Sequence, residues 1–227
     1  MQKVSHRHNQ NKRTLKKLSF NIDEAINLLK INANSKFIET AEIHINLSIK
    51  NSDYQIRNSI ILPNKIPNNS RIAVLTNDDL FAEARAAGAD FVGNTQLIED
   101  IANGNTKFDL LIATPDIMPQ LIRLGKILGS KGLMPSSKSG TITTTLSKTI
   151  REFKQGKFAY KADKTGIVHT RFGKANMSSS ALKENLITLC DAVKINRPPK
   201  SKGQYFKKIY ISSTMGPSIK LDLTTFK

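Results

Sequence analysis

The chain has 227 residues, 39% of them hydrophobic, which excludes a disordered polymer and allows one or two domains with a substantial core. Its 35 Lys and Arg residues against 18 Asp and Glu give a net charge of +17, which indicates a polyanionic partner such as RNA. A single cysteine, Cys190, excludes an intrachain disulfide, and we expect it to be buried in an apolar helix. No apolar run approaches the roughly 20 residues of a membrane-spanning helix, so we expect no membrane partner.

The first 18 residues are polar and basic, without the apolar stretch of a secretory signal. They lack the serine richness of an organellar transit peptide, so we expect a basic arm that becomes ordered on RNA. His6 and His8 are too few to indicate a metal site.

The next segment predicts one helix and two strands. Asn21, followed three residues later by Glu24, is typical of a helix start. Apolar and polar residues alternate over Ala41–Ser48, which predicts a strand with one buried face and places His44 on its polar face. Ser59–Leu62 is a second predicted strand, which ends at Pro63.

The pattern changes after residue 67. Arg71–Thr76 and Phe108–Ala113 are almost entirely apolar, as strands buried on both faces are. Helical patterns follow at 79–87, 96–102, 117–128 and 146–154. Apolar strands that alternate with helices predict a parallel sheet covered on both faces.

Alternation returns from residue 158. We expect a hairpin of strands 158–162 and 167–172 joined by a turn at 163–166. Serines 178–180 are expected to cap a helix that runs to Lys194. Residues 196–203 form a basic loop, and a turn at 214–218 connects predicted strands 205–213 and 219–223.

The sequence therefore predicts a discontinuous α+β domain, residues 1–67 and 158–227, interrupted by an α/β domain, residues 68–157. The inserted segment holds 11 basic and 9 acidic residues, a net charge of +2. The two outer segments together hold 24 basic and 9 acidic residues, a net charge of +15. We expect the outer domain to be the main RNA-binding surface because it carries nearly all of the surplus charge.

Three short segments, 36–42, 163–169 and 214–218, combine residue types that suit RNA. Small residues let a backbone approach RNA closely, and hydroxyl groups bond phosphates and 2′-OH groups. Carboxylates accept from base amino groups or 2′-OH donors, or orient a neighbouring Lys, and aromatic or thioether side chains pack on bases. Three readings stay open: an ordinary turn at 214–218, a buried Phe37 and a turn-forming Asp163. The candidate residues are Lys36, Phe37, Glu39, Thr40, Glu42, Lys164, Thr165, Gly166, His169, Thr214, Met215, Gly216, Pro217 and Ser218.

Four motifs in collinear order resemble the ribosomal L-one family, the stalk proteins of the large ribosomal subunit. They are KFIETAEIHINL (36–47), GKILGSKGLMPSSKSGTIT (125–143), KADKTGIVHTRFGK (161–174) and STMGPSIK (213–220). The resemblance implies a two-part RNA-binding domain interrupted by a Rossmann-like three-layer α/β domain. It also implies RNA contacts at Lys36, Phe37, Thr40, Gly166, His169, Thr214, Met215 and Gly216.

The resemblance further implies that the chain is a structural constituent of the ribosome, monomeric outside it. Its expected partners are 23S-type large-subunit rRNA, with which it builds the mobile stalk, and the deacylated tRNA that leaves the exit site. Bacterial members also repress translation of their own mRNA. Richness in Asn, Ile and Lys indicates an AT-rich genome. We expect the plastid stroma of an alga, with the cytoplasm of a bacterium as the alternative.

Two other classes of protein share some of these features: enzymes and regulators that bind only mRNA. An enzyme is disfavoured because neither dinucleotide-binding nor P-loop glycine patterns occur, and the glycine-rich run 125–132 is predicted to follow a helix instead of a strand. We therefore expect no catalysis, no metal and no cofactor. A free regulator that binds only mRNA would use the same surface as a ribosomal protein, so the sequence does not separate these two.

Overall fold

The computed structural model describes residues 19–49, 56–67, 70–198 and 203–226. It is a mixed α/β structure with a four-stranded, a three-stranded and a two-stranded sheet. The chain divides into two compact units, each described by itself: unit 1 is Met1–Pro67 with Tyr160–Lys227, and unit 2 is Asn68–Ala159. The predicted basic arm and residues 199–202 of the basic loop lie outside the described residues.

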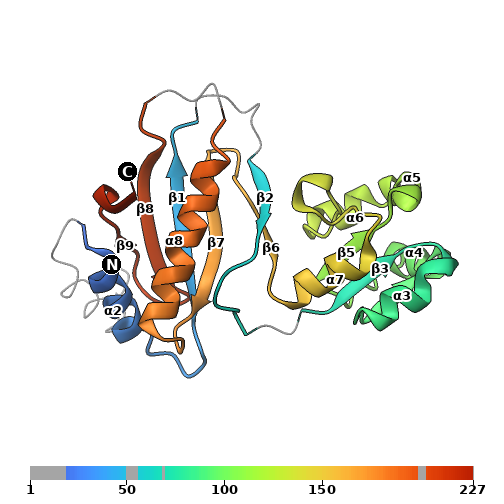
Figure 1. Ribbon diagram of the computed structural model, residues 1–227, viewed down its shortest axis with the longest axis horizontal. Coiled ribbons are helices and arrows are strands. Elements are labelled where there is room, and N and C mark those ends of the chain that lie inside the picture. Colours follow the sequence, from blue (N-terminus) through green and yellow to red (C-terminus); the bar gives the residue numbers. More distant parts are fainter. Residues whose placement is uncertain (1–18, 50–55, 68–69, 199–202, 227) are drawn as a thin grey trace, which may run out of the picture. The chain divides into compact units, whose positions relative to one another are not determined.

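Unit 1 is built on an antiparallel sheet in which β1 lies between β7 and β8 (Figure 1). Ala41, Ile43, Ile45 and Leu47 are buried, while the residues between them are half-exposed. This alternation confirms the predicted strand, because successive side chains of a strand point to opposite faces. The strands, in spatial order, are β7 (Ile167–Lys174), β1 (Thr40–Leu47), β8 (Phe206–Ser213) and β9 (Ile219–Lys220).

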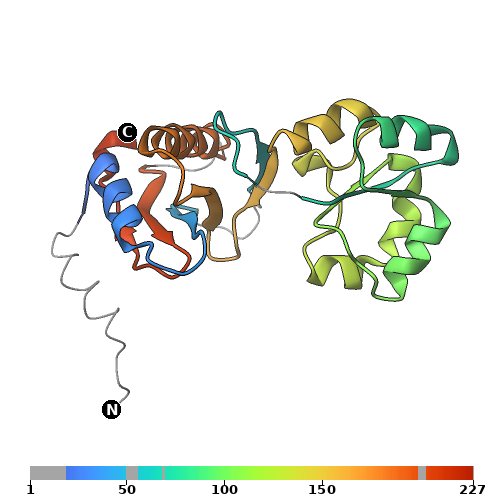
Figure 2. The same cartoon turned by 90° about the horizontal axis from the view of Figure 1, so that it is seen from below.

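Two helices, α2 (Ile22–Asn32) and α8 (Ser179–Ile195), pack against this sheet and against each other. Figure 2 shows α8 along one side of the sheet. The expected serine cap is confirmed, since the hydroxyl of Ser178 accepts a hydrogen bond from the backbone N–H of Ala181 at 3.2 Å. Helix α2 begins after Asn21 as predicted, but the Asn21 side chain makes no capping hydrogen bond.

The predicted hairpin of strands 158–162 and 167–172 is wrong. The turn forms, but β6 (Phe158–Lys161) pairs with β2 (Arg57–Ile60) in a separate sheet, and only the bridge Ala162–Val168 joins it to β7. Strand β7 pairs instead with β1 along its whole length. Chain proximity favoured the hairpin, but strand pairing depends on contacts between the side chains of neighbouring strands, which adjacency in the sequence does not determine.

Two further boundaries in unit 1 differ from the prediction. Strand β2 begins two residues before the predicted Ser59. The predicted strand 219–223 is shorter, since β9 ends at Lys220 and a 3₁₀ helix occupies Leu223–Phe226. In this turn of helix Phe226 is buried, with 9% of its surface exposed.

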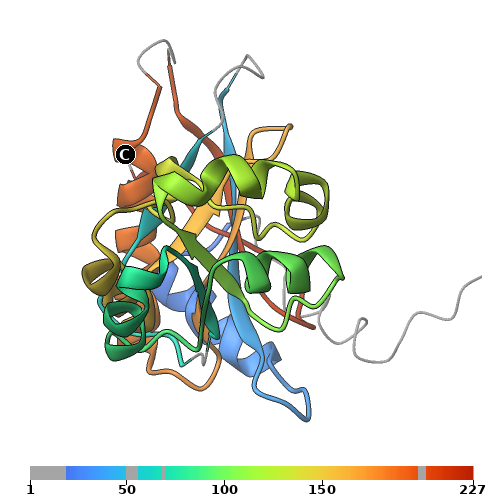
Figure 3. The same cartoon turned by 90° about the vertical axis from the view of Figure 1, so that its right-hand side faces the viewer.

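Unit 2 is built on a parallel sheet, as the apolar runs predict, and β3 lies between β4 and β5 in it. Ile72 and Val74 pack against helices on one face, and Ala73 and Leu75 against helices on the other. Figure 3 shows the ribbon of this unit from the right-hand side of Figure 1. The strands are β4 (Phe91–Gly93), β3 (Ile72–Leu75) and β5 (Leu110–Ala113). The helices are α3 (Phe81–Ala86) and α7 (Leu146–Lys154) on the first face, and α4 (Thr95–Ala102), α5 (Met118–Ile122) and α6 (Gly125–Ser130) on the second.

Three details of unit 2 were not predicted correctly. Strand β4 was missed, because three residues are too few to show a period. The predicted helix 117–128 is divided into α5 and α6, and the backbone N–H of Leu124 donates to the carbonyl of Leu121, three residues back. Gly125 at this break is a poor helix former, which favours the division. Short 3₁₀ helices occupy Asp78–Leu80, Pro115–Ile117 and Ser137–Ser139.

No helix within the described ranges is long and apolar enough to cross a membrane. Cys190 has 1% of its surface exposed, as expected, and burial raises the pKa of its thiol well above the ordinary value. A buried, protonated thiol packs as a small apolar group, so this cysteine serves the core of unit 1.

Candidate nucleic-acid interface

Two predicted segments, residues 35–40 and 214–218, meet at one end of the unit 1 sheet; we call them together the loop-pair site. The backbone N–H of Thr214 donates to the carbonyl of Thr40 at 3.1 Å. In return, the backbone N–H of Thr40 donates to the hydroxyl oxygen of Thr214 at 3.0 Å. These bonds continue the β1–β8 pairing one step beyond Ala41 and Ser213 and join segments that are far apart in the sequence.

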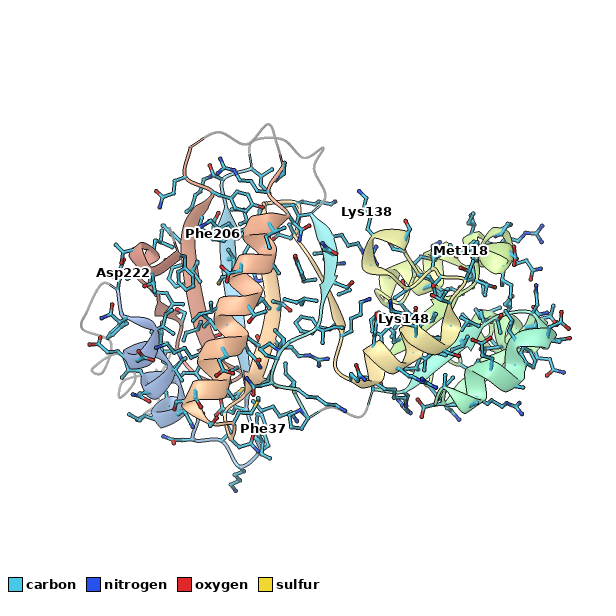
Figure 4. All side chains as sticks on the ribbon, in the orientation of Figure 1. Phe37, Met118, Lys138, Lys148, Phe206 and Asp222 are labelled. Atoms are coloured by element: carbon cyan, nitrogen blue, oxygen red, sulfur yellow. The ribbon has the colours of Figure 1, made fainter. Side chains whose placement is uncertain are left out.

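The loop-pair site presents three large apolar side chains to solvent: Phe37, Met215 and Ile38, which is 56% exposed. Phe37 is 55% exposed and Met215 is 58% exposed, so the alternative of a buried Phe37 is excluded. Figure 4 places Phe37 at the end of unit 1 that lies opposite Phe206, the first residue of β8. Lys36, Thr214 and Ser218 are also exposed, and Thr40, Gly216 and Pro217 are half-exposed. Exposed apolar side chains beside hydroxyl groups and a cation suit the packing of a base or ribose.

Gly216 is required by packing within the turn. Its backbone N–H donates to the carbonyl of Ser213, and a Cβ atom at this position would clash with the Ser213 side chain, which is 3% exposed. A residue without a Cβ therefore lets the turn fold tightly over Ser213. Residues 214–218 can therefore be both a tight turn and a candidate RNA contact, because the same turn exposes Met215.

Glu39 was expected among the residues that contact RNA, but the structure buries its side chain. The side chain is 1% exposed, and its two carboxylate oxygens accept hydrogen bonds from the backbone N–H groups of Ser35 and Met215, both at 3.0 Å. Burial alone would raise the pKa of this carboxyl. The nearby Ser213 hydroxyl and the donors of Met215 and Ser35 outweigh burial and lower the pKa to about 2. The Ser213 hydroxyl lowers the pKa of Glu39 because it lies close to the carboxylate, although its oxygen has no hydrogen-bond partner among the described residues.

The second predicted group, Lys164, Thr165 and Gly166, lies at the other end of strand β1. The carbonyl of Gly166 accepts from the backbone N–H of Leu47 at 3.0 Å. Leu47 is seven residues from Thr40, which at the rise of a β-strand separates this turn from the loop-pair site by roughly 23 Å. Lys164 and Thr165 are exposed, whereas Gly166 is buried. The sequence contained no signal of this separation.

Asp163 forms the turn, as the alternative reading proposed. Its carboxylate accepts from the backbone N–H groups of Thr165 and Ile167 at 2.9 and 2.8 Å, and from the Thr165 hydroxyl at 2.8 Å. The Ile167 and Thr165 hydrogen bonds lower the pKa of Asp163. Gly166 has a φ of 81°, in the left-handed region that favours glycine, so its main role is to close this turn.

Between the two ends, one face of the sheet carries polar side chains from three adjacent strands; we call it the open face. Glu42 lies opposite Arg171 and Ser212, and His44 lies opposite His169 and Tyr210. All of these side chains are exposed or half-exposed. Sequence reasoning did not single out Arg171, Tyr210 and Ser212, although the period-2 pattern of their strands places them on this face. The residues of the open face are Glu42, His44, Asn46, His169, Arg171, Lys208, Tyr210 and Ser212.

Two histidines meet on the open face. Nδ1 of His44 lies 2.9 Å from Nδ1 of His169, and Nε2 of His44 lies 3.2 Å from the hydroxyl oxygen of Ser212. Since a neutral imidazole has one N–H, one ring donates to the other in the neutral pair. Burial, and then the nearby His169, lower the pKa of His44, while Glu42 acts in the opposite direction.

The lowered pKa of His44 predicts a pH dependence of stability. The unfolded chain binds a proton at His44 more readily than the folded chain, so the free energy of unfolding decreases as the pH falls below about 6.5. In the variant His44→Gln we expect a smaller decrease between about pH 7 and pH 5. Urea unfolding of both proteins across this range measures the difference, and equal pH slopes would contradict the prediction.

No group of three or more His, Cys, Asp or Glu side chains that could hold a metal ion occurs in the part of the chain that the structure describes. The glycine-rich run 125–132 begins with helix α6, which follows α5 and not a strand. Its position does not match that of a phosphate-binding loop, which opens a helix directly after a strand.

An antiparallel sheet with one helix-covered face and one polar face, which ends in exposed aromatic and thioether side chains, is typical of proteins that bind nucleic acid. Comparison with known proteins identifies the family of the chain. Residues 28–217 match the model of the ribosomal protein L1p/L10e family.

Three relatives resemble the chain over most or all of its length. It is 55% identical to large ribosomal subunit protein uL1c of Phaeodactylum tricornutum (strain CCAP 1055/1) and 54% identical to that of Trieres chinensis, over 100% of each chain in both cases. It is 50% identical to large ribosomal subunit protein uL1 of Synechococcus sp. (strain CC9605), over 90% of this chain and 88% of the relative.

The chain belongs to the ribosomal protein L1p/L10e family and is of its bacterial and plastid type. It is a structural ribosomal protein and not an enzyme, as the sequence indicates. The chloroplast relatives, followed by cyanobacterial ones, support the plastid stroma as its location, with the bacterial cytoplasm as the alternative.

Proposed function

We propose that this chain binds a folded element of 23S-type rRNA in the large ribosomal subunit directly, through unit 1. The observation that carries the proposal is the loop-pair site, where Phe37 and Met215 are exposed on two segments that are hydrogen-bonded to each other. Apolar side chains exposed together to water do not stabilise the protein, and such a patch marks an interaction site. An RNA junction with accessible bases and riboses provides a surface that they can cover.

The open face extends this contact along the sheet. Arg171 and Lys208 dock phosphates there, and His44, His169 and Tyr210 offer donors and ring faces. The turn with Lys164 and Thr165 contacts the RNA at the far end. A surface that spans roughly 23 Å matches several nucleotides of a folded RNA better than one short single-stranded motif.

The ribosomal role proposed for the chain follows from this binding. We propose that unit 1 corresponds to the RNA-binding domain and unit 2 to a Rossmann-like inserted domain, and that the chain, monomeric outside the ribosome, forms the mobile stalk near the tRNA exit site. There it assists the release of deacylated tRNA. A second role, repression of its own mRNA, would use the same surface on an RNA that imitates the rRNA site.

The first test is the affinity of the full chain for an rRNA stalk fragment and for an unrelated duplex of equal length, across a range of salt concentrations. We expect a preference for the stalk fragment that persists at high salt. Equal affinities that decline together would reduce the interface to a general basic surface and contradict the proposal. Co-sedimentation with large subunits in high salt separates a ribosomal protein from a regulator that binds only mRNA.

The variant Lys164→Ala separates phosphate contacts from shape recognition. Lys164 is exposed at the tip of the 163–166 turn. We expect weaker binding to both RNAs alike and a decrease of about one in the slope of log affinity against log salt, as for the loss of one phosphate contact. An unchanged salt slope would exclude Lys164 from the interface. Lys157→Ala, a lysine of unit 2 paired with Glu152, serves as the control.

A further inference from the structure

Phe37 and Met215, two of the exposed side chains of the loop-pair site, lie on segments that are held in relation to each other by one carboxylate. One oxygen of Glu39 accepts from the backbone N–H of Ser35, which precedes Phe37, and the other accepts from the backbone N–H of Met215 itself. The carboxylate therefore bridges the two segments, with one oxygen for each. The backbone carbonyl of Glu39 also accepts from the N–H of Ala175, at the end of strand β7.

We propose that Glu39 is a positioning residue of the RNA site: its buried carboxylate presets the placement of Phe37 and Met215 and does not itself contact RNA. This inference rests on the proposed function. It differs from the expectation that the carboxylate reads the RNA, because a side chain with 1% of its surface exposed offers almost no area to a ligand.

A carboxylate suits this task better than a neutral group. Hydrogen bonds from backbone N–H groups to an ionised acceptor are shorter and stronger than neutral ones, and burial excludes the water that would compete for them. Both amides would lack an acceptor without Glu39 and would turn toward solvent, which would release the 214–216 turn. RNA would then have to order both segments on binding, and that ordering lowers affinity.

Two variants test the bridge without a large change in volume. Glu39→Gln retains one carbonyl oxygen, so one amide loses its acceptor and faces an N–H donor instead. Glu39→Asp retains the charge, but its side chain is one methylene shorter and does not reach both segments. For each variant we expect affinity for the stalk fragment to fall about tenfold or more, since a charge-assisted hydrogen bond is lost. Affinity for the unrelated duplex should stay within about twofold, because phosphate contacts are untouched.

A second readout separates positioning from direct contact. Hydrogen exchange at the Met215 amide, measured in the RNA-free protein, should be faster in both variants than in the wild type. If affinity falls while this exchange rate is unchanged, Glu39 contacts RNA directly and the proposal is overturned. Retained affinity in both variants would overturn it as well.

Thermal unfolding and a charge-matched variant complete the experiment. Asp191→Asn removes the same charge from an exposed position on α8 and should leave affinity and exchange unchanged. If the Glu39 variants unfold at much lower temperature and lose both RNAs equally, the role of Glu39 is only structural, and the proposal fails. If the wild-type chain shows no preference for the stalk fragment, the proposed function fails instead, while the exchange rate of the Met215 amide still shows whether the carboxylate bridge exists.

Discussion

The substitution Met215→Asp is expected to abolish the preference of the chain for the stalk rRNA fragment. The side chain is 58% exposed, so the change removes little packing within the protein. In the complex it places an unpaired carboxylate next to phosphates, and burial of such a charge costs at least about 3 kcal/mol, which corresponds to a more than hundredfold increase in Kd.

Met215→Leu is the matched control, since it keeps an apolar side chain of similar volume and should change the Kd by less than about fivefold. Both variants should unfold at temperatures close to that of the wild type. Full affinity of Met215→Asp for the stalk fragment would remove the loop-pair site from the interface.

The substitution Thr214→Ala is expected to weaken specific binding by about tenfold to hundredfold and also to lower stability. The Thr214 hydroxyl oxygen accepts from the backbone N–H of Thr40 at 3.0 Å. Without it, this exposed N–H loses its partner at a cost of about 0.5–1.5 kcal/mol, and the turn that carries Met215 is tied less firmly to β1. The fold itself remains, because the backbone bond from Thr214 to Thr40 does not depend on the side chain.

Thr214→Ser retains the hydroxyl group and should restore both affinity and unfolding temperature nearly to wild-type values. Titration with the stalk fragment and thermal unfolding of the three proteins measure the two effects together. Equal affinities of Thr214→Ala and Thr214→Ser would show that the hydroxyl has no part in recognition.

Local patterns predicted most of the helices and strands of this fold. The alternation in β1, the apolar runs of β3 and β5, and helix α7 at 146–154 all agree with the structure. Each of these elements buries one face or both faces along its length, so the period of its side chains is visible in the sequence alone. The predictions were wrong where a strand is too short to show a period, as in β4. They were also wrong where the pairing partner of a strand had to be predicted, as for β6 and β7.

In the candidate site, too, local patterns predicted some features and contacts between distant segments decided the others. The sequence identified the residue types, and the exposed positions of Phe37 and Met215 are consistent with their predicted role. It grouped Glu39 with the neighbouring residues expected to contact RNA, because a buried carboxylate with two backbone donors from distant segments leaves no local pattern. The meeting of His44 and His169 likewise depends on the register between β1 and β7.

The sequence by itself determined the charge distribution, the class of each main element, and a set of residues suited to RNA. It also indicated the family, because four motifs in collinear order can be recognised in the sequence without knowledge of the structure. Only the tertiary structure decided which of these residues share a surface, which lie at opposite ends of β1, and which is buried beneath the others. The reason is physical: composition and period are local properties of a chain, whereas burial and hydrogen-bond partners arise from contacts between segments that are distant in the sequence.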